Sequence, residues 1–416
     1  MSSTAVPTTQ VARVKGEATG GEFIALVTLL MAMTAMGIDI MLPAFPDIRE
    51  EFGMAADSTQ VTWILTAFFL GMAVGPWVFG PASDRFGRKP MMVAGLVMYM
   101  AAAAAATFAP TWELLVLSRF VWGIAAGGPR TLSVAMVRDR FEGDAMARLM
   151  STIMAIFLLV PILAPSVGAA LIAVFPWRAV FVFPALMALL LLVWSRRLPE
   201  TLPVDRRRAF TWRSVAQAGR EVVTHRTTVL MTIAMTFLFG VMTAFIGNAE
   251  IILEDVYGYR AWFPLWFGLV AVALAVSSLN NARLVGHLGV VRLVRRLMLL
   301  GVIGGAVLVA VSFTGGGVPN FWLFSIVLVL VLPMAQGANP NANTIAMAPV
   351  PHVAGTASAV MATVTIAGGS VFGTIASEAF DGTVRPYVIF TFAYMVIAAV
   401  LIWWGTAART HHVEAG

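Results

Sequence analysis

Gly80-Pro81-Ala82-Ser83-Asp84-Arg85-Phe86-Gly87-Arg88-Lys89-Pro90 is a basic, glycine-punctuated stretch that lies between two apolar runs, 62–79 and 91–110. Four charged residues fall within positions 84–89, whereas neither flanking run carries a charge. Each run approaches the ~20 mostly apolar residues that a helix needs to cross a bilayer. The stretch therefore predicts a short turn between two membrane-spanning helices.

The composition of the whole chain agrees with a membrane protein. Of 416 residues, 59% are hydrophobic and 12% are charged, whereas soluble proteins average roughly 45–50% and about 25%. Backbone exposed to lipid has to satisfy its own hydrogen bonds, so the apolar runs are expected to be helices. They predict an all-α membrane protein with twelve spans, at approximately 23–46, 60–80, 91–109, 112–136, 146–173, 178–195, 227–250, 262–284, 296–313, 320–346, 354–379 and 386–405.

The distribution of the 27 Lys and Arg residues indicates which way the spans run. With the N-terminus inside, 21 of them fall on inner segments and two within spans, and only Arg49, Arg178, Arg260 and Arg385 fall outside. Cytoplasmic loops carry the excess of positive charge, so we expect both termini in the cytoplasm of a bacterial inner-membrane protein. The net charge of +6 then reflects orientation in the bilayer, and we expect no nucleic-acid partner.

Several classes of chemistry are not expected. Residues 1–20 lack the apolar core of a cleavable signal, so the first apolar run is expected to remain as a span. The chain has no cysteine, and its five histidines lie in or beside loops without metal-ligand spacing. No nucleophile–base arrangement appears within the spans. We therefore expect no metal, no cofactor and no enzymatic activity.

The longest polar stretch divides the chain into two sets of six spans. It predicts a cytoplasmic tail (1–22), a first half (23–195), an interdomain loop (196–226), a second half (227–408) and a final tail (409–416). Residues 210–215 mix apolar and basic side chains, as expected of a helix on the inner membrane surface. Residues 285–290 occupy the loop equivalent to 83–88, with Gly289 matching Gly87, which suggests an internal duplication. Paired halves around a central cavity are typical of transporters.

The chain resembles the major facilitator superfamily, whose loop between helices 2 and 3 carries Gly-x-x-x-Asp-Arg-x-Gly-Arg-Lys. More narrowly, it resembles the Bcr/CflA group of drug:proton antiporters. The first match consists of Gly80, Asp84, Arg85, Gly87, Arg88 and Lys89. The narrower match consists of Asp39-Ile40-Met41-Leu42-Pro43-Ala44-Phe45-Pro46, Val137-Arg138-Asp139, Asn281-Ala282-Arg283-Leu284-Val285 and Ala354-Gly355-Thr356-Ala357-Ser358-Ala359.

The resemblance implies a conformational latch on the cytoplasmic side, made by Gly80, Asp84, Arg85, Gly87 and Arg88. The two glycines would permit tight turns, and Asp84 could accept hydrogen bonds from a helix N-terminus.

One motif of the resembled group is incomplete in this chain. The antiporter motif of span 5, roughly Gly-Pro-x-x-Gly-Gly, is represented only by Pro165 and Gly168 in Ala164-Pro165-Ser166-Val167-Gly168-Ala169. Small residues there would still allow close helix packing.

Asp39 is the first candidate for coupling transport to protons, because it lies in the first span among apolar residues. An Asp near the centre of a spanning helix costs ~2.5–3.5 kcal/mol, so such a residue is functional by default. The alternative is an interfacial acid near the outer helix end. Arg119 in span 4, with Gly123, matches the Arg-x-x-x-Gly pattern of the resembled family and could hold a nearby carboxylate ionised.

Further polar residues within the spans are candidates for the cavity wall. Arg130 lies eleven residues after Arg119, close to three helical turns, so both should share a face; alternatively Arg130 snorkels to the cytoplasmic interface. Glu250 could bind a proton or cation, or sit in a solvated outer mouth with Glu254 and Asp255. The amides expected to face the cavity or another helix are Asn248, Asn339, Asn341 and Asn343.

Together these features predict a monomeric transporter that exports amphipathic, antibiotic-like drugs in exchange for protons. Its partners would be the drug, protons and the lipid bilayer, with Asp39, Arg119 and Glu250 as coupling residues. An uptake symporter of the same fold, importing a small metabolite, is the alternative. A membrane sensor or channel without coupled transport is a third possibility.

Overall fold

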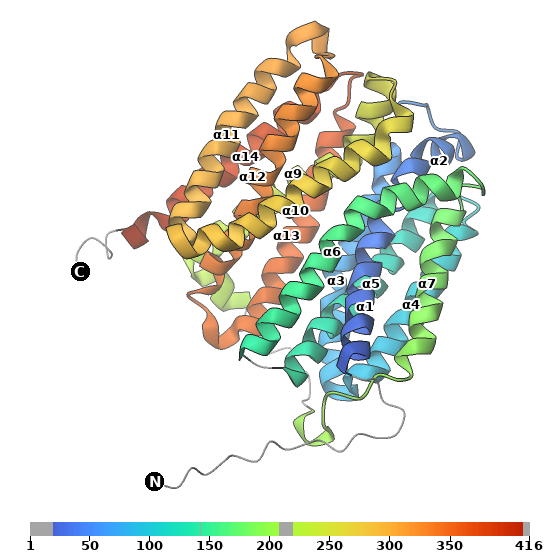
Figure 1. Cartoon of the computed structure of the whole chain (residues 1–416), viewed down its shortest axis with the longest axis vertical. Helices are drawn as coiled ribbons and strands as arrows, with labels where there is room; N and C mark the ends of the chain where they lie inside the picture. The colour runs from blue at the N-terminus through green and yellow to red at the C-terminus, as the bar shows by residue number, and fades with distance from the viewer. Residues whose placement is uncertain (1–19, 142, 208–218, 411–416) are drawn as a thin grey trace.

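Long helices running between two ends of a bundle make up the described structure (Figure 1). The computed structural model describes residues 20–141, 143–207 and 219–410. The expected surface helix at 210–215 and most of both expected tails lie outside these residues. The helices of the first half are α1 (Gly20–Asp39), α2 (Phe45–Glu51), α3 (Trp63–Phe86), α4 (Arg88–Thr107), α5 (Trp112–Arg140), α6 (Gly143–Ile172) and α7 (Ala179–Ser195). Those of the second half are α9 (Arg226–Ile251), α10 (Phe263–Leu288), α11 (Val290–Ser312), α12 (Phe321–Met347), α13 (Ala354–Glu378) and α14 (Arg385–Thr410).

The predicted all-α membrane fold is confirmed. Ten segments of the described chain are long and apolar enough to cross a membrane. The other two expected spans are α7, which has 17 residues, and α5, which carries Glu113, Arg119 and Arg130. With α1 and the short α2 counted as one span, the described residues contain the twelve spanning helices that the sequence predicts.

Several helices extend beyond the apolar runs that predicted them. The expected span 60–80 becomes α3, which continues to Phe86, and the expected span 296–313 becomes α11, which begins at Val290. Charged side chains at a helix end can reach the membrane surface while the backbone remains helical. Apolar length therefore underestimates helix length at these ends.

Small residues let α3 and α5 cross with their backbones in contact. A Cβ atom added to Gly71 would lie 2.0 Å from the carbonyl oxygen of Phe120, and one added to Gly123 would lie 2.0 Å from that of Phe68. Such close approach is typical of helix pairs in membranes, where small residues mark the interface. This crossing fixes the position of α5, which carries Arg119 and Arg130.

The helices form two groups that lie side by side, the first from α1 to α7 and the second from α9 to α14 (Figure 1). The contacts between the groups are made chiefly by α3 with α13 and by α6 with α10. We call the lower end of the bundle in Figure 1, which carries the α3–α4 turn, the basic end. Arg85, Lys89, Arg138 and Arg196 lie at the ends of helices there. The other end is called the opposite end.

Candidate functional site

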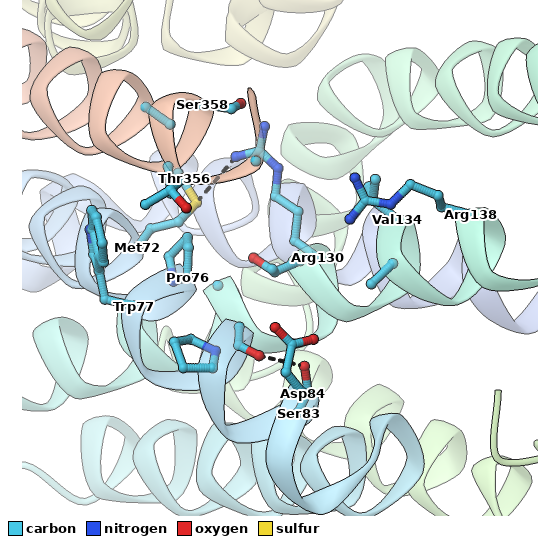
Figure 2. Close-up of a pocket in the computed structure, with 18 of the residues that line it drawn as sticks. Met72, Pro76, Trp77, Ser83, Asp84, Arg130, Val134, Arg138, Thr356 and Ser358 are labelled. Atoms are coloured by element: carbon cyan, nitrogen blue, oxygen red, sulfur yellow. Dashed lines mark hydrogen bonds between the residues drawn. The ribbon is translucent and has the colours of Figure 1, made fainter. Parts of the chain in front are cut away.

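A cavity of about 900 Å³ lies between the two groups of helices, toward the basic end (Figure 2). Its walls come from α3, α5 and Arg88 at the start of α4 in the first half, and from α12 and α13 of the second. It reaches the surface at the basic end, where Asp84 and Arg138 are exposed. The volume lies within the ~300–1,000 Å³ typical of sites for small molecules. The two halves therefore share a site of suitable size for a small organic solute.

Arg130 projects into this cavity from α5 (Figure 2). Its side chain is exposed to the cavity, and its Nη1 atom lies 4.0 Å from the sulfur of Met72 on α3. Arg138, two turns further along α5, also lines the cavity. Within the described part of the chain, neither guanidinium has an ion-pair partner. Arg130 thus occupies the cavity wall and not the membrane surface.

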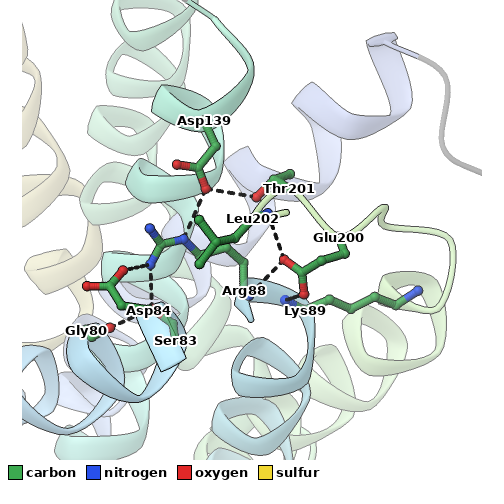
Figure 3. Close-up of polar contacts among 9 residues, drawn as sticks. All are labelled: Gly80, Ser83, Asp84, Arg88, Lys89, Asp139, Glu200, Thr201 and Leu202. Carbon is green, nitrogen blue, oxygen red and sulfur yellow. Dashed lines mark hydrogen bonds and ion pairs between the residues drawn. The ribbon is translucent and has the colours of Figure 1, made fainter. Parts of the chain in front are cut away.

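The stretch that predicted a turn forms a compact ionic network at the basic end (Figure 3). The Arg88 guanidinium donates hydrogen bonds to Ser83 (2.6 Å), Asp84 (2.7 Å) and Asp139 at the end of α5 (3.0 Å). This arrangement ties α3, α4 and α5 together. Arg85 is exposed, with its guanidinium 5.1 Å from the centre of the Phe86 ring.

Two expectations about this stretch need correction. Gly80 lies inside α3 and makes no turn, and the chain reverses at Gly87 alone, whose φ of +104° suits glycine. Asp84 does not accept from the N-terminus of α4. Glu200 does so instead, accepting from the backbone N–H groups of Arg88 (2.9 Å) and Lys89 (3.2 Å). The reason is that α3 continues to Phe86, which leaves Asp84 within reach of the Arg88 side chain.

The opposite end is closed by a buried ion pair between the halves. Arg49 of α2 donates two hydrogen bonds to the carboxylate of Glu250 in α9, at 3.0 and 2.8 Å, and both side chains are almost fully buried (4% and 3% exposed). Glu250 is therefore largely shielded from water, although it borders a smaller cavity of about 390 Å³ that Glu254 also lines. The sequence places Arg49 in an outer segment and does not predict this pairing, because no local signal connects it to a residue 201 positions away.

Other contacts reinforce this closure. The hydroxyl groups of Thr66 in α3 and Thr374 in α13 form a hydrogen bond across the halves. The indole of Trp63 donates to Glu378 at 3.0 Å. Together with the Arg49–Glu250 pair, these contacts seal the opposite end while the cavity stays open to the basic end.

Asp39 is the last residue of α1 and is buried (4% exposed). Within the described residues, its carboxyl group has neither a hydrogen-bond donor nor a cationic partner. Arg119 is fully buried nearby and donates to the carbonyl oxygen of Gly37 at 2.9 Å, two residues before Asp39. Its Nη1 atom has no partner, and its guanidinium lies 4.4 Å from the ring centre of Phe68. Unlike Arg130, Arg119 does not line the cavity.

The four amides occupy different environments. Asn343 lines the cavity, whereas Asn341 donates to Asn281 of α10 at 2.7 Å and so joins two helices of one half. Asn339 is half-buried outside the cavity lining. Asn248 is fully buried and donates to Ser377 of α13 at 2.8 Å. Asn248 and Asn341 therefore join helices of the second half, and Asn343 alone of the four lines the cavity.

Gly168 of α6 packs directly against the residue that follows Asp39. A Cβ atom at Gly168 would lie 2.0 Å from the carbonyl oxygen of Ile40. Pro165 lies one turn earlier within the same helix. The incomplete motif thus keeps the small residue where α6 crosses the end of α1.

Comparisons with known proteins agree with this architecture. The family model of the Major Facilitator Superfamily matches residues 27–374. A bicyclomycin resistance protein homolog of Haemophilus influenzae is 28% identical over 390 residues, covering 93% of this chain and 96% of that protein. The multidrug transporter MdfA of Edwardsiella ictaluri is 28% identical over 301 residues, covering 70% of each chain.

Among solved structures, a D-xylose–proton symporter superposes with a TM-score of 0.72 at 15% identity, covering 92% of this chain and 97% of the other. At that identity the likeness concerns the fold alone. The matched proteins are transporters and not enzymes.

Proposed function

The chain belongs to the major facilitator superfamily, and we propose that it exports amphipathic, antibiotic-like molecules in exchange for protons by alternating access. The observation that carries this proposal is the asymmetry of the bundle. A cavity shared by the halves is open at the basic end, and buried contacts seal the opposite end. A solute entering at the basic end would leave when the seal opens and the basic end closes.

The orientation of the bundle in the membrane is inferred from the distribution of charge. Basic residues concentrate on cytoplasmic segments, which assigns the basic end to the cytoplasm of a bacterial inner membrane. In that orientation the structure represents an inward-open state. The names of the relatives, a bicyclomycin resistance homolog and a multidrug transporter, support export of antibiotics.

Proton coupling would act through two buried carboxyl groups. Asp39 has no cationic partner in this state, and Arg119 has a free Nη1 atom near the same helix end, so Asp39 would alternate between a proton and Arg119. Protonation of Glu250 would remove one charge of the pair that closes the opposite end. Each proton that enters contributes about 2.3 kcal/mol per 100 mV of membrane potential.

We expect Asp39→Asn to reduce the rate of proton-driven drug efflux at least about tenfold, because the amide cannot carry a proton. Efflux from proteoliposomes would be measured with and without an imposed pH gradient and with an uncoupler. Asp57→Asn, at an exposed acid of the opposite end, is the matched control and should retain efflux. Full proton-driven efflux by Asp39→Asn would reject the assignment.

An uptake symporter is the second candidate, favoured by the incomplete antiporter motif around Pro165 and Gly168. The same proteoliposomes distinguish the two functions. When protons move into the lumen, an exporter would deplete the solute in the lumen, whereas an uptake symporter would accumulate it there.

A further inference from the structure

The cavity wall carries positive charge that the described residues do not neutralise. Four charged residues line it: Asp84, Arg88, Arg130 and Arg138. Asp84 and Arg88 bind each other at 2.7 Å, and Arg88 also binds Asp139. Arg130 and Arg138 have no acidic partner in the described part of the chain. The cavity therefore offers two guanidinium groups to whatever enters it.

These two groups are placed for binding an anion. They lie eight residues apart on α5, close to two helical turns, and so share the face that lines the cavity. The Arg130 guanidinium extends toward α13 of the other half, where Thr356 and Ser358 carry hydroxyl groups (Figure 2). A guanidinium fork matches carboxylate, phosphate or sulfonate oxygens with two parallel hydrogen bonds, and hydroxyls can donate to the same anion.

The remaining wall is suited to an apolar body. Met72, Val134 and Ile366 line the cavity. Trp77 also lines it, and its indole donates to Thr363 of α13 at 2.6 Å, which fixes the ring. Flat aromatic and flexible thioether side chains bind varied apolar shapes. A solute that fills this site would have both an apolar part and a charged part.

We infer that the substrate of this cavity is an amphipathic organic anion whose acidic group binds Arg130. Two cations that line a cleft without an acidic partner raise the local concentration of anions there. Arg138, nearer the surface, attracts the same group as it enters. The inference deepens the proposed function, on which it rests in taking the cavity as the substrate site.

A matched pair of fluorescent ligands tests the inference: dansylglycine, which carries a carboxylate, and its neutral amide. Affinities would be measured by fluorescence titration of the full chain in phosphatidylcholine nanodiscs. We expect the wild-type protein to bind the carboxylate at least about tenfold more tightly than the amide. We expect Arg130→Gln to weaken carboxylate binding by about tenfold to a hundredfold and to leave amide binding unchanged. Unchanged amide binding shows that the variant is folded.

Two further variants sharpen the result. Arg130→Lys keeps the charge but loses the fork, so it should give an intermediate carboxylate affinity. Arg140→Gln, on the same helix but outside the cavity lining, should bind like the wild type.

Equal binding of the two ligands by the wild type, no carboxylate binding, or a preference that survives Arg130→Gln would each overturn the inference. Adding phosphatidylglycerol tests a lipid headgroup as the anion, and its competition with dansylglycine would overturn the assignment to a soluble substrate. Carboxylate binding without proton-driven export would leave the inference standing and reject the proposed function. Drug export without any preference for the carboxylate would support the proposed function and overturn the inference that the substrate is an anion.

Discussion

At the scale of single residues, the Arg49–Glu250 pair connects α2 of the first half to α9 of the second. Breaking a buried pair leaves an uncompensated charge and costs about 3–5 kcal/mol. In the proposed alternating-access scheme, that cost falls on the state in which the opposite end is closed, because the two side chains would separate when that end opens. Glu250→Gln should therefore shift the population toward opening at the opposite end.

The absence of natural cysteines makes this shift measurable by labelling. Thr62 is buried (3% exposed) and faces the other half, since a Cβ atom added to Gly247 would lie 3.5 Å from its Cγ2 atom. Maleimide labelling of Thr62→Cys should become at least about tenfold faster when Glu250→Gln is added. The control is Arg178→Gln, which breaks a partly exposed pair with Glu51 inside one half and should change labelling little. Equal labelling in both backgrounds would contradict a gating role for Glu250.

At the scale of elements, the two glycines at the α3–α4 connection should respond differently to alanine. Gly87 has φ +104° and ψ 156°, a conformation that other residues adopt only at a cost of about 1–3 kcal/mol. Gly80 lies within α3 with open space around its Cα atom, where alanine stabilises a helix by roughly 0.5–1 kcal/mol. We expect Gly87→Ala to lower the thermal unfolding midpoint in detergent and Gly80→Ala to leave it unchanged or raise it. Similar losses for both would contradict the helical assignment of Gly80.

The same stretch shows how far sequence reasoning extends. The spanning helices could be predicted, because the bilayer requires about 20 apolar residues per helix whatever the tertiary contacts. The end of α3 could not, since the six residues that follow the expected span 60–80 remain helical although they include Asp84 and Arg85. Nor could the role of Glu200, which lies 112 residues from Arg88 in sequence and caps α4 only after the bundle has formed.

Some residues of the candidate site could likewise be predicted from the sequence, and others could not. A charged residue inside a span stands out in the sequence, so Arg130 and Glu250 could be selected as functional candidates. The partner of Glu250 could not, because Arg49 lies in an outer segment like Arg178 and Arg260, and only packing buries it against Glu250. The separation of Arg119 from the cavity likewise depends on how closely α3 and α5 cross.

At the scale of the whole molecule, alternating access requires the two halves to separate at the opposite end when the basic end closes. Thr66 and Thr374 lie at that seam, one on each half, with their hydroxyls in contact. A disulfide between Thr66→Cys and Thr374→Cys would hold the opposite end closed, and with no natural cysteine it would be the only one possible. Oxidation should abolish efflux, and reduction should restore it.

The cross-linked protein also separates binding from transport. Its cavity remains open at the basic end, so the oxidised variant should bind dansylglycine from that side with wild-type affinity. Each single cysteine variant should transport equally under oxidising and reducing conditions. Efflux that persists after complete cross-linking would mean that the solute leaves without opening between α3 and α13, and the two-state scheme built on this seam would have to be abandoned.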